Sequence, residues 1–396
     1  MQSLRKKKLL YFINGYLIKN NTMRVAYMLD NATPWNSGIW FHRVKSPTES
    51  LMLRGHTVKQ FAIGKERPSK EILEWPDVVI FGRTYPDAFN PIEDMKAFKK
   101  AGKRVVWDFD DDLWAVEKNN PSVLVSSVYK DQYEGMIREA DAITTPSPIL
   151  AKKVKKLCKG KPVFICPNAI NFEDYKERPR VARGDDVFVG YMAASSHYDD
   201  MAIAVDAMEI LSQKYPNVFF YLYGLTAEPF EAAIYNVRKI LQNNLQPEKE
   251  EVLKSMLETY DKFKNIRLIH KPFMPPEIHP MILASLDFDI GIAPLVDNEF
   301  NHGKSCIKMY EYAATGTCTL SSDVLPYSDE VSYRAKNTVK DWVAKLEKLI
   351  VDKPFREKLQ MEQSKWVREN RSIEKVGVMW EKACQLPGGL KVSSQS

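Results

Sequence analysis

Short apolar runs alternate with longer stretches of helical periodicity along most of the chain. This alternation is typical of parallel β-sheets whose strands are connected by helices. The pattern occurs twice, and the charged connector NFEDYKERPRVARGDD separates the two series. Strands are predicted at residues 24–29, 78–82, 104–109, 142–146 and 162–166 in the first series, and at 187–192, 218–224, 266–270, 289–295 and 317–322 in the second. The sequence therefore predicts two α/β domains in series, with a boundary near Pro179.

The length and composition agree with two domains. The chain has 396 residues, of which 44% are hydrophobic, and this length exceeds the size at which a single core usually stops growing. Trp366 and Trp380 recur on a helical period and predict a final helix that packs back against the first domain. We expect a leader at 1–22, a first domain at 23–178, a second domain at 179–365, and a terminal helix with a tail at 366–396.

The leader contains a basic cluster followed by an apolar stretch, LRKKKLLYFINGYLI. The apolar part is too short to span a bilayer. It could pack on the protein, lie on a membrane surface, or precede a start at Met23. We favour a role away from the membrane and keep peripheral membrane contact as the alternative.

The cysteines and the charge narrow the environment and the partners. Five cysteines are odd in number and show no paired metal-ligand spacing, so neither a disulfide framework nor a zinc site is expected, and a cytoplasmic location fits best. The formal charge of +6 arises from 57 basic and 51 acidic residues dispersed along the chain. This balance weakly favours an anionic partner, without the dense basic stripe of a dedicated nucleic-acid binder.

Ligands of wound sheets bind beyond the carboxyl ends of the strands, so the residues there are the candidates for a site. After the first strand, Ser37 and Gly38 could bring backbone close to a phosphate or a sugar, and Arg43 begins the next helix. Arg83 ends the second strand, where it could neutralise an anion or form a surface ion pair. The alternative for Ser37 and Gly38 is an ordinary turn between a strand and a helix.

The segment WDFDDDLW places four aspartates at the end of a predicted strand: Asp108, Asp110, Asp111 and Asp112. Their mutual repulsion is costly unless a positive or hydroxylated group approaches them. They could hold a divalent metal, accept hydrogen bonds from sugar hydroxyls, or act as a base for an acceptor. The alternative is that one or two of them cap the next helix while the others face water.

The segment FNHGKSCIKMYEYAATG follows a strongly apolar strand. A helix is predicted from about Lys304, so that Lys304, Lys308 and Glu311, spaced by four and three residues, share one face. The amides at a helix start attract phosphate, and Ser305 adds a donor. The carboxylate of Glu311, deeper on the same face, suits the two hydroxyls of a ribose. The alternative is a solvated amphipathic helix that ends at a glycine.

From Met23 onwards the sequence resembles the retaining GT-B glycosyltransferases of the group-one, family-four type. The residues that carry this resemblance are SGIWFHR with LMLRGH, TPSPILAKKVKK with VFICPNAINFEDY, VGYMAASSHYDD, and APLVDNEFNHGKSCIKMYEYAATGTCTLSSDVLPY. FNHGKS, IKMYE and DFDDDLW together are similar to a subgroup found in phage and bacterial sugar-modification loci. The resemblance implies two Rossmann-like domains that face each other across a cleft, with a C-terminal helix that crosses back to the first domain.

The resemblance also implies roles for particular residues. Glu311 matches the glutamate that binds the ribose in this family, and the helix start binds the diphosphate. Gly303 occupies the position of a second family glutamate, with Asn301 nearby, so both are expected on the donor side. Ser195, Ser196 and His197 replace the usual arginine-bearing loop. The expected donor-binding residues are Ser37, Gly38, Ser195, His197, Asn301, Gly303, Lys304, Ser305, Lys308 and Glu311.

The activity implied is transfer of a hexose from a nucleotide sugar, most simply a UDP-glucose-like donor, to a hydroxyl with retention of anomeric configuration. Lys304, Asp110 and Asp111 are the expected catalytic residues, and Arg43, Arg83, Asp108 and Asp112 are expected on the acceptor side. No cofactor or metal is expected to be obligatory. The acceptor would be a surface glycan, a protein, or a hydroxylated base in phage DNA. The alternatives are a nucleotide-sugar epimerase and a non-catalytic sugar-nucleotide binder, since one fold carries many functions.

Overall fold

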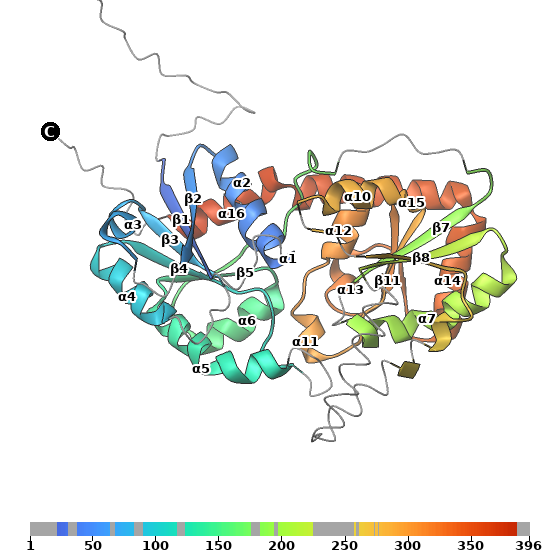
Figure 1. The fold of residues 1–396 in the computed structure, drawn as a ribbon, viewed down its shortest axis with the longest axis horizontal. Helices are drawn as coiled ribbons and strands as arrows, with labels where there is room; N and C mark the ends of the chain where they lie inside the picture. Colours follow the sequence, from blue (N-terminus) through green and yellow to red (C-terminus); the bar gives the residue numbers. More distant parts are fainter. Residues whose placement is uncertain are drawn as a thin grey trace, which may run out of the picture.

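The protein folds into two α/β domains that lie side by side (Figure 1). This computed structural model describes residues 22–30, 38–63, 68–82, 90–116, 123–175, 183–193, 197–224, 257–258, 261–272, 274–275 and 277–385. The leader up to residue 21 and the predicted domain boundary at Pro179 lie outside the described residues. In the described part of the chain, no helix combines the length and apolar character needed to cross a bilayer.

The first domain is a parallel six-stranded sheet in the order β2-β1-β3-β4-β5-β6. Five of its strands were predicted from continuous apolar runs. The sixth, β2, was not predicted, because the adjacent Lys59 and Gln60 interrupt its apolar residues and leave no continuous run. The strands are β1 (Arg24–Asp30), β2 (Thr57–Ile63), β3 (Val78–Phe81), β4 (Arg104–Asp108), β5 (Ala142–Thr145) and β6 (Val163–Ile165). The helices are α1 (Gly38–Trp40), η1 (Phe41–Lys45), α2 (Ser46–Leu53), α3 (Lys70–Glu74), α4 (Pro91–Lys100), α5 (Val123–Glu139) and α6 (Pro148–Leu157).

The second domain is also a parallel six-stranded sheet, in the order β12-β11-β10-β7-β8-β9. The strand order reverses between β7 and β10, and the crevice at such a switch point is where wound sheets bind ligands. The strands are β7 (Val187–Met192), β8 (Val218–Gly224), β9 (Leu268–Pro272), β10 (Ile290–Ala293), β11 (Cys318–Ser322) and the unpredicted two-residue β12 (Arg334–Ala335). The helices are α7 (Tyr198–Lys214), α10 (His279–Leu286), α11 (Glu299–His302), α12 (Ile307–Ala314), α13 (Tyr327–Glu330), α14 (Val339–Val351) and α15 (Lys353–Arg371).

The last described helix, α16 (Ile373–Cys384), crosses from the second domain to the first, as predicted (Figure 1). Ser372 forms a parallel bridge with Ile170 at the crossing point. From there α16 packs on α2 and buries Trp380 in the same cluster as β1 and β3. Trp366 lies on α15 and packs in the second domain beside Tyr310, so only the second tryptophan reaches the first domain. The crossing helix thus joins the two cores on one side of the cleft.

Candidate functional site

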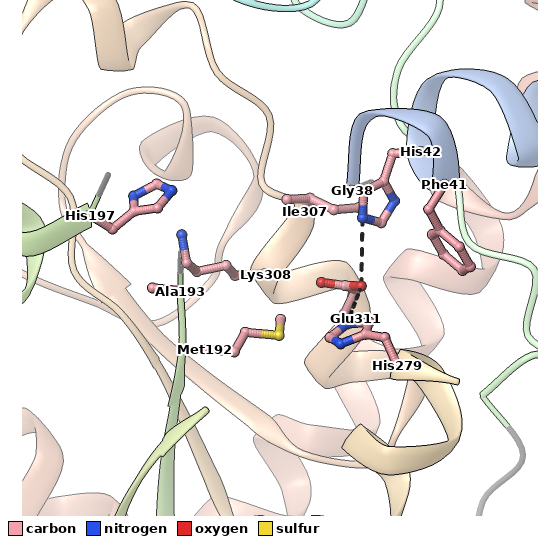
Figure 2. A pocket seen from close by; sticks show the side chains of 10 residues that line it. All are labelled: Gly38, Phe41, His42, Met192, Ala193, His197, His279, Ile307, Lys308 and Glu311. Carbon is pink, nitrogen blue, oxygen red and sulfur yellow. Dashed lines mark hydrogen bonds and ion pairs between the residues drawn. The ribbon is translucent and has the colours of Figure 1, made fainter. Parts of the chain in front are cut away.

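The cleft between the domains contains two adjoining cavities. Their volumes are about 130 Å³ and about 270 Å³. Both are lined by Gly38 and His42 from the first domain and by His197, Ile307 and Lys308 from the second. Because they share these residues, they form one continuous site at the switch point of the second sheet. Figure 2 shows the smaller cavity, with η1 on one side and α12 on the other.

The helix that carries the candidate phosphate site begins later than predicted. It starts at Ile307, and the short helix α11 precedes it. The side chain of Asn298 caps α11 by accepting from the amide of Asn301, and this separate turn ends at Gly303. Lys304 and Ser305 therefore lie in the connection, not on a helical face with Lys308 and Glu311. They still line the larger cavity.

The start of α12 is suited to an anion. Its N-cap residue, Cys306, makes no side-chain hydrogen bond to the first turn. The first amides of a helix have no partner within the helix and carry the positive end of its dipole. Ile307 and Lys308 line the cleft at this point, so a phosphate there would meet both backbone donors and a lysine.

A glycine in β10 brings α12 close to the sheet, and a glycine in β7 makes room for Phe288. A Cβ at Gly291 of β10 would lie 2.4 Å from the ring of Tyr312, and one at Gly190 of β7 would lie 2.2 Å from Phe288. The Tyr312 hydroxyl donates to the carbonyl of Gly190 at 3.1 Å and accepts from the amide of Met192 at 3.0 Å. A larger residue at Gly291 would push α12 away, so this glycine fixes the depth of Lys308 and Glu311 in the cleft.

Glu311 is held by three side chains through a single oxygen. Its Oε1 accepts from Tyr175 at 2.7 Å, lies 3.0 Å from His279 Nε2, and lies 3.7 Å from His42 Nε2. Burial alone would raise the pKa of Glu311, but His279, His42 and Tyr175 outweigh burial and lower it to about 2. Among the described residues no hydrogen bond is made to Oε2, and the carboxylate faces the cavity (Figure 2). The site therefore offers an ionised carboxylate with one oxygen fixed and the other available.

Two of the histidines that line the cleft, His42 and His197, are neutral. Burial lowers the pKa of His42 to about 4. Burial, together with the nearby Lys308, lowers the pKa of His197 to about 4 despite a 2.6 Å contact from its Nδ1 to Asp200. Burial also lowers the pKa of Lys308 to about 8. Lys308 is thus a cation at neutral pH that readily loses its proton when the cleft is empty.

This pKa predicts a pH dependence of anion binding. A diphosphate favours the protonated form of Lys308, so binding takes up a proton once the empty site has lost it. The dissociation constant of a nucleoside diphosphate is therefore expected to stay level below about pH 8 and to rise by up to about tenfold per pH unit above it. Isothermal titration calorimetry over this range measures the effect. Lys308→Arg should flatten the profile because arginine stays protonated, and an unchanged slope in that variant would contradict the assignment.

Arg43 and Asp108, which were expected on the acceptor side, pair with each other below the cleft. Arg43 Nη2 donates to Asp108 at 2.6 Å, and both side chains are buried. Arg43 also donates to Asn168 Oδ1 at 2.9 Å, and Asn168 Nδ2 donates to Ser305 Oγ at 2.8 Å. Neither Arg43 nor Asp108 is among the residues lining the two cavities. Their visible role is to orient Asn168 and, through it, Ser305.

The remaining aspartates divide into two groups. Asp112 is buried and accepts from Lys153 at 2.7 Å, and the same lysine reaches Glu299 of the second domain at 2.9 Å. Asp110 and Asp111 line the larger cavity opposite the Lys304 side. Within the described ranges no group of three or more His, Cys, Asp or Glu side chains is arranged to hold a metal ion. Asp110 and Asp111 are thus the members of the cluster that face the cleft.

Asn301 and Gly303, expected on the donor side, make structural contacts. Asn301 Nδ2 donates to the carbonyl of Val296 at 3.0 Å. The carbonyl of Gly303 accepts from Ser147 Oγ at 2.7 Å, across the domain junction. A Cβ at Gly303 would lie 3.3 Å from the Cβ of Asp112. A glycine here allows the domains to meet closely, where a side chain as large as glutamate would need the junction to open.

Three expected site residues, Ser37, Arg83 and Ser195, lie outside the described residues. Sequence reasoning did not assign roles to Tyr175, His279 or His42, which surround Glu311. Tyr175 lies in the quoted segment VFICPNAINFEDY, whereas a lone histidine such as His279 carries no signal of its own. His42 lies in η1, a five-residue π-helical turn, and such turns are frequent at functional sites.

Comparisons with known proteins support the fold. No protein-family model matches the sequence, and no curated protein matches it. Among solved structures, a glycosyltransferase from Rickettsia africae is 11% identical and covers 92% of this chain and 99% of its own, with a TM-score of 0.59. HepE of Anabaena, solved in complex with UDP and glucose, is 10% identical over 91% of this chain and 98% of its own, with a TM-score of 0.58. A UDP-forming α,α-trehalose-phosphate synthase from Burkholderia xenovorans is 9% identical over 92% of this chain and 98% of its own, with a TM-score of 0.57.

At such low sequence identity, the structural likeness shows a shared fold and nothing about function. The chain has the two-domain GT-B fold of these enzymes, with two Rossmann-like domains and a returning C-terminal helix.

Proposed function

We propose that the protein is a glycosyltransferase that moves a hexose from a nucleotide sugar to a hydroxyl acceptor with retention of anomeric configuration. The observation that carries this proposal is the pair of Lys308 and Glu311 on the cleft face of α12. A lysine beside uncapped helix amides suits a diphosphate, and an ionised carboxylate one turn further along suits the ribose hydroxyls. A nucleoside diphosphate has both groups.

A UDP-sugar is the favoured donor, with UDP-glucose as the first candidate. The support comes from HepE, whose structure holds UDP and glucose, and from the synthase described as UDP-forming. In this proposal the diphosphate lies at Lys304, Ser305, Lys308 and the start of α12. The ribose contacts Oε2 of Glu311, and the hexose to be transferred extends between His42 and His197.

In the reaction the bond from the anomeric carbon to the diphosphate oxygen breaks, and a bond from that carbon to the acceptor oxygen forms. Negative charge develops on the leaving diphosphate, where Lys304, Lys308 and the helix amides stabilise it. Asp110 and Asp111 lie across the larger cavity, where a carboxylate can orient the acceptor hydroxyl and take its proton. The walls of the cleft limit the entry of water, which would otherwise hydrolyse the donor.

The donor assignment predicts a loss of affinity in Glu311→Gln. Glutamine keeps the size and can still accept from Tyr175, but it presents an amide in place of one carboxylate oxygen. Losing charged hydrogen bonds to the ribose should weaken UDP binding by about 1.5 to 3 kcal/mol. Calorimetry measures the change. The control is Asp297→Asn, which changes an exposed carboxylate in the loop between β10 and α11. Unchanged UDP affinity in a folded Glu311→Gln protein would remove Glu311 from the donor site.

Product analysis tests the function against the epimerase and the non-catalytic binder. The protein is first screened by thermal shift with UDP, GDP, ADP and TDP sugars, because a bound donor stabilises the native state. The donor that binds is then incubated with and without glycan, protein and hydroxylated-DNA acceptors. A transferase consumes donor with an acceptor present, an epimerase changes the sugar without one, and a binder does neither. NMR of the product decides between retention and inversion.

The acceptor is proposed to be a surface glycan or a hydroxylated base in DNA. Salt dependence separates the two, since DNA binding weakens steeply with salt as counterion release is lost.

A further inference from the structure

A further cavity, separate from the two in the cleft, lies at the amino ends of the strands of the first sheet. Its volume is about 810 Å³, within the range of small-molecule sites. It is lined by Lys103 and Arg104 at the start of β4, Asp141 before β5, Phe164 of β6 and Lys382 of α16. Because Asp110 and Asp111 follow the opposite end of β4, about 15 Å or more of strand separates this cavity from the cleft.

Arg104 is the key residue of this cavity, because the residue is largely buried while the Nη1 and Nη2 groups at its tip have no hydrogen-bond partner among the described residues. The residue is 6% exposed. Its Nε donates to the carbonyl of Ala383 at 3.1 Å, at the end of α16. An arginine has five N–H donors, so the four on Nη1 and Nη2 remain. Within the described residues they have no hydrogen-bond partner and no carboxylate within ion-pair distance.

No neighbouring carboxylate among the described residues forms an ion pair with Arg104, although Asp141 lies near enough to raise its pKa. Both oxygens of Asp141 are engaged, one by the amide of Val105 at 2.9 Å and the other by Lys99 at 3.3 Å. Burial raises the pKa of the adjacent Cys384 to about 12, so that thiol stays neutral. Lys103 adds an ammonium that donates to the carbonyl of Glu74 at 2.9 Å, and the exposed Lys382 adds another. A largely buried arginine with no ion-pair partner, close to two lysines, favours an external anion.

We propose that this cavity is a second binding site, distinct from the cleft, for the phosphate group of a soluble small molecule. The Nη1 and Nη2 groups of Arg104 would bind two phosphate oxygens in the bidentate geometry that guanidinium favours. Lys382 and Lys103 would supply further charge at the mouth. Phe164 would offer an apolar wall to the remainder of the molecule. Burial lowers the pKa of both Arg104 and Lys103, and the opposing effect of Asp141 on Arg104 and of Asp77 on Lys103 is smaller.

Hydrogen exchange with inorganic pyrophosphate as the probe locates the site directly. The full-length Lys308→Gln protein is used, so that binding in the cleft is weakened. We expect pyrophosphate to protect peptides that cover residues 102–105 and 380–385. Protection confined to peptides of the cleft, or none at all, would overturn the proposal.

Calorimetry in the same background tests the residues. Arg104→Gln is expected to lower pyrophosphate affinity about tenfold or more, and Lys382→Gln about threefold. Lys375→Gln, which removes an exposed lysine from the same helix, should leave affinity unchanged. If Arg104→Gln does not fold, the Lys382→Glu variant tests the site instead, because reversing an exposed charge does not disturb the core. This variant should bind pyrophosphate more weakly than Lys382→Gln. Equal affinity in every variant would overturn the site.

A vesicle arm separates a soluble ligand from a lipid headgroup. Pyrophosphate affinity that depends on Arg104 supports the soluble ligand. The opposite result would be a protein that has no affinity for pyrophosphate but sediments with vesicles containing phosphatidic acid, provided that Arg104 and Lys382 are intact. That result would overturn the soluble ligand in favour of a lipid.

Discussion

Lys308→Gln is expected to lower the rate of sugar transfer by about 100-fold to 1,000-fold, the range found when one preorganised donor to a developing anion is removed. The side chain is 8% exposed, and it lies in a cleft where the screening by water is reduced. In the proposed reaction, negative charge on the diphosphate grows as the glycosidic bond breaks. The lysine therefore stabilises the transition state more than the bound donor, and kcat should fall by a larger factor than the affinity for the intact nucleotide sugar.

The measurement is steady-state transfer with the donor identified by thermal shift, together with the affinity for the same donor by calorimetry in the absence of acceptor. Lys340→Gln removes an exposed lysine from α14 and serves as the control. Lys308→Arg restores the charge with a different geometry and should recover part of the rate. A Lys308→Gln enzyme with weaker donor binding but unchanged kcat would place the lysine in ground-state binding alone.

The sequence predicted those parts of the site that depend on one local segment. A glycine-lysine-serine connection followed by a lysine and a glutamate three residues apart identified α12, because these spacings are set by the helix itself. The boundary was wrong by three residues, since the capping of α11 by Asn298 makes a separate turn that the hydrophobic period does not reveal. Strands with continuous apolar runs were also predicted, because such a run is typical of a strand that is buried on both faces. The edge strand β2 was not predicted, because Lys59 and Gln60 interrupt its apolar residues.

The parts that depend on distant segments could not be read from the chain. Tyr175 and His279 lie 136 and 32 positions from Glu311 in sequence, so only the tertiary structure brings them together. Likewise, four neighbouring aspartates looked equivalent in sequence. The fold separates them, because Asp108 points into the ion pair with Arg43 while Asp110 and Asp111 line the cavity. Asp108 and Asp112 pair with partners more than thirty residues away and do not line the cavity.

Replacement of both Asp110 and Asp111 by asparagine is expected to lower transfer by about 100-fold or more, the contribution typical of a positioned general base. Asparagine keeps the size of each side chain and removes the charge that would orient the acceptor hydroxyl and accept its proton. The proposed donor groups, Lys308 and Glu311, belong to the opposite domain, so UDP affinity should survive the double change. Transfer assays and calorimetry on the same preparation measure the two effects separately.

The control for this variant is Asp131→Asn, which removes an exposed carboxylate from α5 in the same domain. Treatment of the unmodified enzyme with EDTA distinguishes a base from a metal ligand, because a base needs no divalent ion. Activity should change little. If EDTA abolishes transfer and magnesium or manganese restores it, Asp110 and Asp111 act by coordinating a metal. If the double variant instead loses UDP affinity while its rate at saturating donor is kept, the two aspartates belong to the donor side of the cleft.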